Sequence, residues 1–370
     1  MIASKHDESV MLWPKPIWFD NHQHLQQVKG YHLLKDINWP SHGFFHLHSQ
    51  CHDLIRHKLP DGFRYYVLSW HGEYIHHEWL EAQNIDAPII LLHDWNNYQP
   101  NRLPKNVYAV RWIYWHHIFE KMMQWFGVEY TKDIKYKVSA FCNRITQSKL
   151  WITTAILKQY HPADRLIGLS DWLEEKNVHH WQKTGNPTLD DLQEEFRIHW
   201  LGKKISIDEF GPEQNYQIFT ANPAHPAYQQ AALHFTNESW HYSLMFENNK
   251  EFIYSGPNFS EKTLKCLLGA TAFIPVGQFD VYRTLSDLGM IFDYGFDLSF
   301  DQDPGNITRA TKIIALLQNL DRYSADELFQ MTRQSSLHNQ ELIVSRDFYK
   351  VCENHNVQNI CHLQKLLDHV

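Results

Sequence analysis

The residues with the clearest chemical potential are Ser260, Glu261 and Lys262, which open a segment with leucines at helical spacing. Ser260 is a favourable N-cap because its hydroxyl accepts hydrogen bonds from the unpaired amides of a first helical turn. The same amides and the helix dipole attract anions. A pyrophosphate can bind these amides and Lys262 while Glu261 accepts hydrogen bonds from a ribose diol. The pattern predicts a nucleotide-diphosphate site that needs no metal ion; the alternative is an ordinary capped helix with two solvated charges.

Apolar runs on both sides of this helix supply the elements that must position it. Residues 242–246 form the first run, a polar loop follows, and residues 272–276 form the second run behind the helix. Apolar runs of this length, bounded by polar and glycine-containing stretches, are typical of strands. We therefore predict a strand, a loop, a helix and a strand between residues 242 and 277.

The order of residues in this unit resembles the donor-binding motif of α1,3-fucosyltransferases. That motif runs Phe-Glu-Asn, a loop, Thr-Glu-Lys, a helix and Val-Pro-Val-Val followed by glycine. The matching residues here are Phe246-Glu247-Asn248, Ser260-Glu261-Lys262 and Phe273-Ile274-Pro275-Val276-Gly277. Serine replaces the threonine, and the loop is longer, so that Tyr254 only loosely parallels an aromatic residue of the family.

The resemblance implies which residues bind the donor. The implied donor-binding residues of this unit are Glu247, Asn248, Tyr254, Ser260, Glu261 and Lys262. Because the aromatic position and the loop length differ, the resemblance supports a sugar-nucleotide transferase more firmly than it supports fucose as the sugar.

A second segment with basic residues lies between residues 136 and 159. Residues 136–141 read as a strand, a polar turn follows, and residues 149–159 read as a helix. In the resembled transferases a basic residue about six positions after an asparagine meets the donor phosphates. Asn143 and Lys149 have that spacing, with lysine where the family has arginine, and Arg144 is a rival. Lysine can hold a phosphate as a point charge without the bidentate fork of arginine; the alternative is a solvated lysine at a helix start.

The alternation of apolar runs and helical segments predicts an α/β fold with parallel sheets. The resemblance implies a GT-B architecture, in which two Rossmann-like domains face a central cleft. The length also favours two domains. We predict an acceptor domain at residues 1–130, a nucleotide-sugar-binding domain at 131–330 and a helical tail at 331–370. The predicted strands include 44–48, 63–69, 88–93, 107–113, 166–169 and 233–239, and the predicted helices include 189–200 and 306–320.

Two other groups of polar residues are candidates for chemistry. Asn237 and Glu238 fall at the end of a predicted strand, which is where Rossmann-like sheets bind ligands. Four aspartates lie between residues 293 and 303, but their spacing does not fit the EF-hand loop. We interpret the aspartate segment as a surface loop.

Composition limits the class of protein. A hydrophobic content of 43% and a charged content of 21% are typical of a globular protein in water. The five cysteines form no Cys-x-x-Cys pair, and adjacent histidine pairs lack the i, i+4 spacing of a helical metal site. We expect no metal and no cofactor beyond the nucleotide sugar. No signal-like or membrane-spanning stretch is apparent, which favours the cytoplasm.

An inverting transferase needs a carboxylate that takes the proton of the acceptor hydroxyl as it attacks the anomeric carbon. Glu73 and Asp94 each follow a predicted strand of the first domain, at the edge where first-domain bases lie. Both are therefore candidates for the general base.

The acceptor and the activity itself leave alternatives open. A transferase could act on a carbohydrate hydroxyl or on a hydroxymethylated DNA base, for which the basic residues between positions 29 and 64 would contact phosphates. The net charge of −8 argues mildly against a broad phosphate-binding surface. A third possibility is a carbohydrate-binding, transferase-like protein without catalysis.

Overall fold

A computed structural model gives the fold of two compact units. Unit 1 comprises Met1–Ile118, Asn249–Asn258 and Arg346–Val370, and unit 2 comprises Phe119–Asn248 and Phe259–Ser345. The predicted domain limits stay a prediction. The described residues are 43–48, 63–70, 75–76, 89–93, 105–111, 130, 132–142, 147–169, 183–205, 226–237, 252–253, 257, 259, 261–345, 347–348, 350–352, 354–355 and 358.

Unit 1 contains a four-stranded sheet in the order β1-β2-β4-β5, and every neighbouring pair is parallel. The strands are β1 (Gly43–His48), β2 (Phe63–Trp70), β4 (Ile89–His93) and β5 (Val107–Arg111). The four strands that apolar runs predict in this part of the chain are confirmed. A short antiparallel pair joins β3 (Ile75–His76) to β9 (Phe252–Ile253).

Unit 2 contains a second parallel sheet of four strands, in the order β10-β8-β6-β7. The strands are β6 (Tyr136–Cys142), β7 (Arg165–Leu169), β8 (Ala231–Asn237) and β10 (Ala272–Val276). Every residue of β8 and β10 is buried. Such uninterrupted burial is what a parallel sheet requires when helices cover both of its faces.

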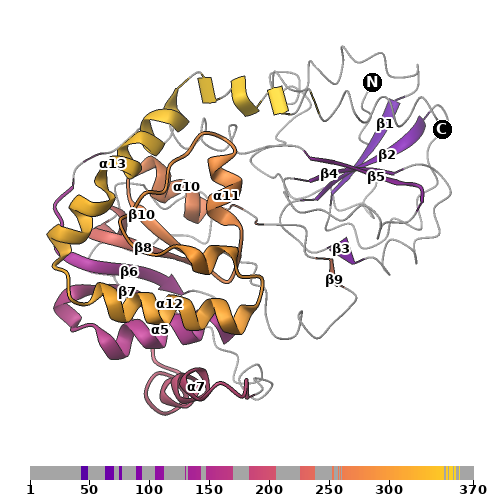
Figure 1. Ribbon diagram of the computed structural model, residues 1–370. Coiled ribbons are helices and arrows are strands. Elements are labelled where there is room, and N and C mark those ends of the chain that lie inside the picture. The colour runs from indigo at the N-terminus through magenta and orange to yellow at the C-terminus, as the bar shows by residue number, and fades with distance from the viewer. Residues whose placement is uncertain are drawn as a thin grey trace. The chain divides into compact units, whose positions relative to one another are not determined.

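Helices cover both faces of the unit 2 sheet (Figure 1). One face carries α10 (Glu261–Leu268) and α13 (Ala325–Val344), and the other carries α5 (Gln147–Gln159) and α12 (Asn306–Leu320). A further helix, α7 (Pro187–His199), packs against α5 on the side away from the sheet. This enclosure buries α5 on every side from Gln147 to Leu157. The chain is therefore an α/β protein, as predicted.

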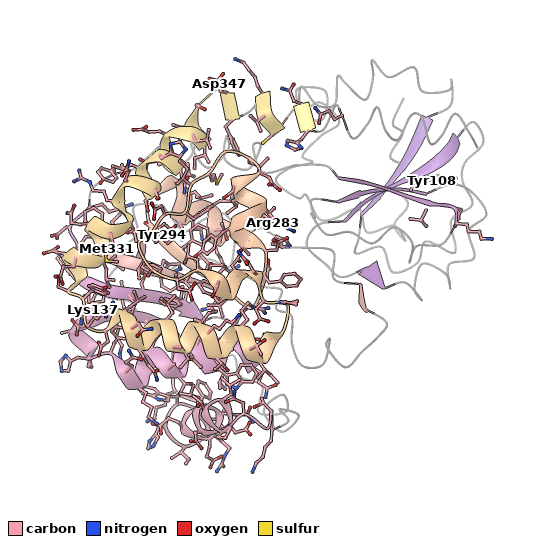
Figure 2. All side chains as sticks on the ribbon, viewed as in Figure 1. Tyr108, Lys137, Arg283, Tyr294, Met331 and Asp347 are labelled. Atoms are coloured by element: carbon pink, nitrogen blue, oxygen red, sulfur yellow. The ribbon has the colours of Figure 1, made fainter. Side chains whose placement is uncertain are left out.

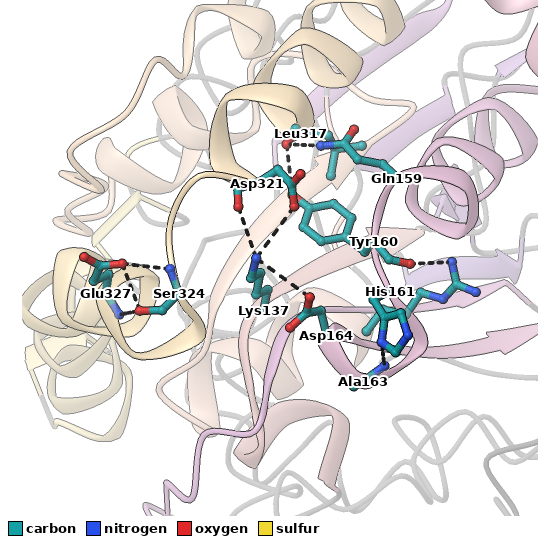
Figure 3. Close-up of polar contacts among 11 residues, drawn as sticks. Lys137, Gln159, Tyr160, His161, Ala163, Asp164, Leu317, Asp321, Ser324 and Glu327 are labelled. Carbon is teal, nitrogen blue, oxygen red and sulfur yellow. Dashed lines mark hydrogen bonds and ion pairs between the residues drawn. The ribbon is translucent and has the colours of Figure 1, made fainter.

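The amino ends of the strands are tied to the helices by polar contacts (Figure 3). Lys137, the second residue of β6, lies 3.6 Å from an Asp321 carboxylate oxygen and 3.8 Å from one of Asp164. Tyr160 donates a hydrogen bond of 2.9 Å to the carbonyl of Leu317, which fixes the end of α5 on α12. Figure 2 shows Lys137 at this end of unit 2 and Arg283 at the opposite end.

A lysine also joins the amino ends of β8 and β10. Lys132 donates hydrogen bonds of 2.5 Å to the carbonyl of Tyr228, before β8, and of 2.7 Å to the hydroxyl of Thr271, before β10. Burial lowers the pKa of Lys132 from 10.5 to about 7. Lys132 therefore links the segments before β8 and β10, and its charge depends on pH.

The segment after β10 packs as an aromatic cluster beneath α13. The cluster contains Phe273, Tyr282, Phe292, Tyr294 and Phe300, with neighbouring ring centroids 4.7 to 6.1 Å apart. Figure 2 labels Tyr294 of this cluster within unit 2. Asn339 of α13 holds the same segment, because its side chain accepts from the amide of Ile291 and donates to the Ile291 carbonyl, both at 2.8 Å. Among the described residues no helix is long and apolar enough to cross a membrane.

Candidate functional site

The strand order of unit 2 places a topological switch point between β6 and β8. From β6 the chain adds β7 on one side, and it later adds β8 and then β10 on the other side. In open parallel sheets ligands bind outside the carboxyl ends of the strands where the order reverses. The residues at this point are Cys142, which ends β6, and Asn237, which ends β8. The prediction that Asn237 lies at a strand end is confirmed.

Two helices begin at this edge of the sheet, on opposite faces. Only short segments separate the end of α5 from β7 and the end of α10 from β10. Both helices therefore run antiparallel to the strands, and their amino ends lie at the carboxyl edge. The amino end of α12 lies there as well, because α12 runs beside α5 and their carboxyl ends meet through Gln159, whose amide donates to the Leu317 carbonyl at 2.7 Å. Helix amino ends carry partial positive charge, so this edge favours an anion.

Lys149 adds a full positive charge in the first turn of α5. The residue is 2% exposed, so the alternative of a solvated lysine at a helix start does not hold. Its charge acts on the thiol of Cys142 at the end of β6: burial raises the pKa of Cys142, and the nearby ammonium of Lys149 opposes this rise. Lys149 therefore adds its positive charge to the positive end of the α5 dipole.

Two buried polar atoms, one at the start of α5 and one at the end of β8, have no hydrogen-bond partner within the described part of the chain. One is the hydroxyl oxygen of Ser148, in the first turn of α5, and the other is Oδ1 of Asn237. The residues are 1% and 4% exposed. The Asn237 amide is fixed by its Nδ2, which donates a hydrogen bond of 2.8 Å to the carbonyl of Phe141 in β6. Oδ1 is therefore the acceptor that stays available.

The amino end of the helix after β10 binds a carboxylate of the chain itself. This short helix, α11 (Val281–Ser286), presents the amides of Val281 and Tyr282 to the carboxylate of Asp301, each at 2.9 Å. Burial raises the pKa of Asp301 to about 7, although these two amide bonds oppose the rise. The interpretation of the aspartate segment as a surface loop is wrong at Asp301, which is 3% exposed because its segment folds back onto α11.

The structure describes only part of the predicted donor site. Lys149 lies at the amino end of α5, Lys262 is half-buried in the first turn of α10, and Glu261 begins α10 as predicted. The topology brings these two helix starts to one edge of the sheet. The other predicted site residues lie outside the described residues: Glu73, Asp94, Asn143, Arg144, Glu247, Asn248, Tyr254 and Ser260, as does the predicted strand at 242–246.

One candidate residue at this edge, Ser148, was not predicted from the sequence. Its signal was its place beside Lys149 at the start of a predicted helix, where a hydroxyl and an ammonium can bind one anion. Within the described ranges no group of His, Cys, Asp or Glu side chains is arranged to hold a metal ion.

Comparison of the chain with protein-family models, with curated proteins and with solved structures gave no match.

Proposed function

We propose that this chain is a glycosyltransferase whose donor is a nucleotide-diphosphate sugar, bound at the carboxyl edge of β6 and β8. The observation that carries the proposal is the burial of Lys149 in the first turn of α5, beside the switch point. Positive charge at this place is complementary to a diphosphate. Lys262, at the start of α10, supports the same ligand from the other face of the sheet.

The chemistry follows from where charge develops. When the bond between the anomeric carbon and the diphosphate breaks, negative charge grows on the leaving diphosphate. Lys149, Lys262 and the amides of the two helix starts would offset this charge, which is the largest effect that such a site can contribute. Inversion would be completed by Glu73 or Asp94 as the base that takes the proton of the acceptor hydroxyl.

The GT-B architecture is part of the proposal. Two compact units, each built on a parallel four-stranded sheet, are what a GT-B enzyme needs for separate donor and acceptor domains. Unit 2 would hold the nucleotide sugar, and unit 1 would supply the acceptor site and the base.

Ligand-induced thermal stabilisation tests the proposal. GDP-, UDP-, dTDP- and CMP-sugars are screened against the full chain, and we expect one nucleotide class to raise the melting temperature. Lys149→Met should weaken that binding at least about 10-fold, because a hydrogen bond to a charged group is worth about 1.5–3 kcal/mol. Lys158→Met is the matched control, since Lys158 lies on the same helix with 59% of its side chain exposed. The absence of any stabilisation, or equal binding by both variants, would contradict the proposal.

A further inference from the structure

We propose that Ser148 and Asn237 are ligand-binding residues, with Ser148 donating a hydrogen bond to a phosphate and Asn237 accepting one from a hydroxyl of the nucleotide sugar. The inference rests on the proposed function and deepens it. Its basis is that each residue carries a buried polar atom, at the switch point, with no partner among the described residues.

A buried hydroxyl or amide oxygen that has lost its water and gained no partner destabilises the fold. Five buried side-chain oxygen atoms of this kind occur in the described residues; that of Asn237 lies at the end of β8, and that of Ser148 lies in the first turn of α5, the helix that follows β6. A ligand at this edge would supply the partners that the protein does not.

Ser148 lies next to Lys149 in the first turn of α5, at the positive end of the helix, so its hydroxyl would donate to the same phosphate. Asn237 is different, because its Nδ2 is already committed to the Phe141 carbonyl and Oδ1 can only accept. An acceptor beside a diphosphate repels phosphate oxygens, so its partner must be an O–H or N–H group.

The ligand group that meets Asn237 is therefore a hydroxyl close to the diphosphate. Two parts of a nucleotide sugar carry such hydroxyls, namely the ribose and the transferred sugar. The ribose and the transferred sugar both offer a hydroxyl donor, and deoxy analogues distinguish between them.

The first experiment compares Ser148→Ala with Thr154→Val. Thr154 also has a buried hydroxyl without a partner in the described part, but it lies more than one turn further along α5. Neither change should lower the stability of the ligand-free protein in urea, because each removes an unsatisfied polar atom. Ser148→Ala should weaken binding of the nucleoside diphosphate that stabilises the wild type about 10- to 100-fold in calorimetric titration, and Thr154→Val should leave it unchanged.

The second experiment titrates Asn237→Leu and the wild type with GDP, UDP, their 2′-deoxy forms and the matching nucleotide sugars. If Asn237 accepts from the ribose, the wild type should favour the ribonucleotide several-fold and the variant should lose this preference. If Asn237 accepts from the transferred sugar, the variant should instead lose its preference for the nucleotide sugar over the diphosphate.

The outcomes separate the two proposals. No binding of any nucleotide by the wild type would overturn both of them. If Ser148→Ala binds as tightly as the wild type and Asn237→Leu keeps the preferences for the ribonucleotide and the nucleotide sugar, only this inference is overturned. Buried water would then be the partner of the Ser148 hydroxyl and of Asn237 Oδ1. If Asn237→Leu fails to fold, Ser148→Ala and its control decide the result alone.

Discussion

Lys132 makes the stability of unit 2 depend on pH, and the size of the effect can be calculated. The pKa of Lys132 is about 7 in the folded protein and returns to 10.5 in the unfolded chain. Between these values the unfolded state binds a proton that the folded state does not, so the free energy of unfolding rises with pH. One pKa unit corresponds to 1.36 kcal/mol, and the two titrations together give a gain of about 2 kcal/mol from pH 7 to pH 9.

The test replaces Lys132 with methionine, which keeps the length and apolar stem of the side chain. The Tyr228 carbonyl stays paired in this variant, because Thr271 also donates to it at 2.5 Å. Other groups titrate over the same pH range, among them the buried tyrosines, but they are common to both proteins and cancel in the difference. The free energy of unfolding of the wild type minus that of Lys132→Met should therefore rise by about 2 kcal/mol from pH 7 to pH 9.

Urea unfolding followed by circular dichroism measures this difference at each pH. Lys135→Met is the control, because Lys135 lies three residues away with 52% of its side chain exposed and pairs with exposed Asp133. Its difference from the wild type should stay nearly flat with pH, since exposed ion pairs contribute little. A flat difference for Lys132→Met as well would show that Lys132 keeps an ordinary pKa and would refute the reasoning.

Two further predictions concern polar residues buried around the aromatic cluster. The raised pKa of Asp301 contributes stability that is complete below pH 3.8 and is lost as pH rises through about 7. The free energy of unfolding of the wild type minus that of Asp301→Asn, measured in urea, should therefore fall by about 2 kcal/mol from pH 5 to pH 7. A difference that rises over this range would contradict the prediction. Asn339→Leu should lower the free energy of unfolding by about 1–3 kcal/mol, because it removes both hydrogen bonds to the backbone of Ile291. A loss below about 0.5 kcal/mol for Asn339→Leu, within the range of neutral surface changes, would show that water replaces these bonds.

Local sequence pattern predicted the elements of unit 2 well. Strand β10 and helix α12 have the predicted bounds, and α10 begins at the predicted Glu261. These elements are specified by the periodicity of their own apolar residues, which is a local property. Burial on one face of the helix or on both faces of the strand then follows from the same residues.

Features that depend on contacts distant in sequence were not predictable in this way. Asp301 is buried because it folds back onto α11, which begins twenty residues earlier, and nothing in its neighbours distinguishes it from a loop aspartate. Lys149 is buried because α7 and α12 pack around α5, and those helices follow it in sequence. The strand reversal between β6 and β8, which defines the candidate site, depends on the whole sheet.

The helix starts of unit 2 differ in a way that bears on function. The first turn of α13 carries Asp326 and Glu327 and closes a capping box with Ser324, and α11 receives the carboxylate of Asp301. In both cases an acid of the chain itself offsets the positive end of the helix. The first turn of α5 contains no acid and instead carries buried Lys149 and Ser148. A carboxylate in this first turn would stabilise the helix, so its absence is consistent with the proposed anionic ligand at the switch point.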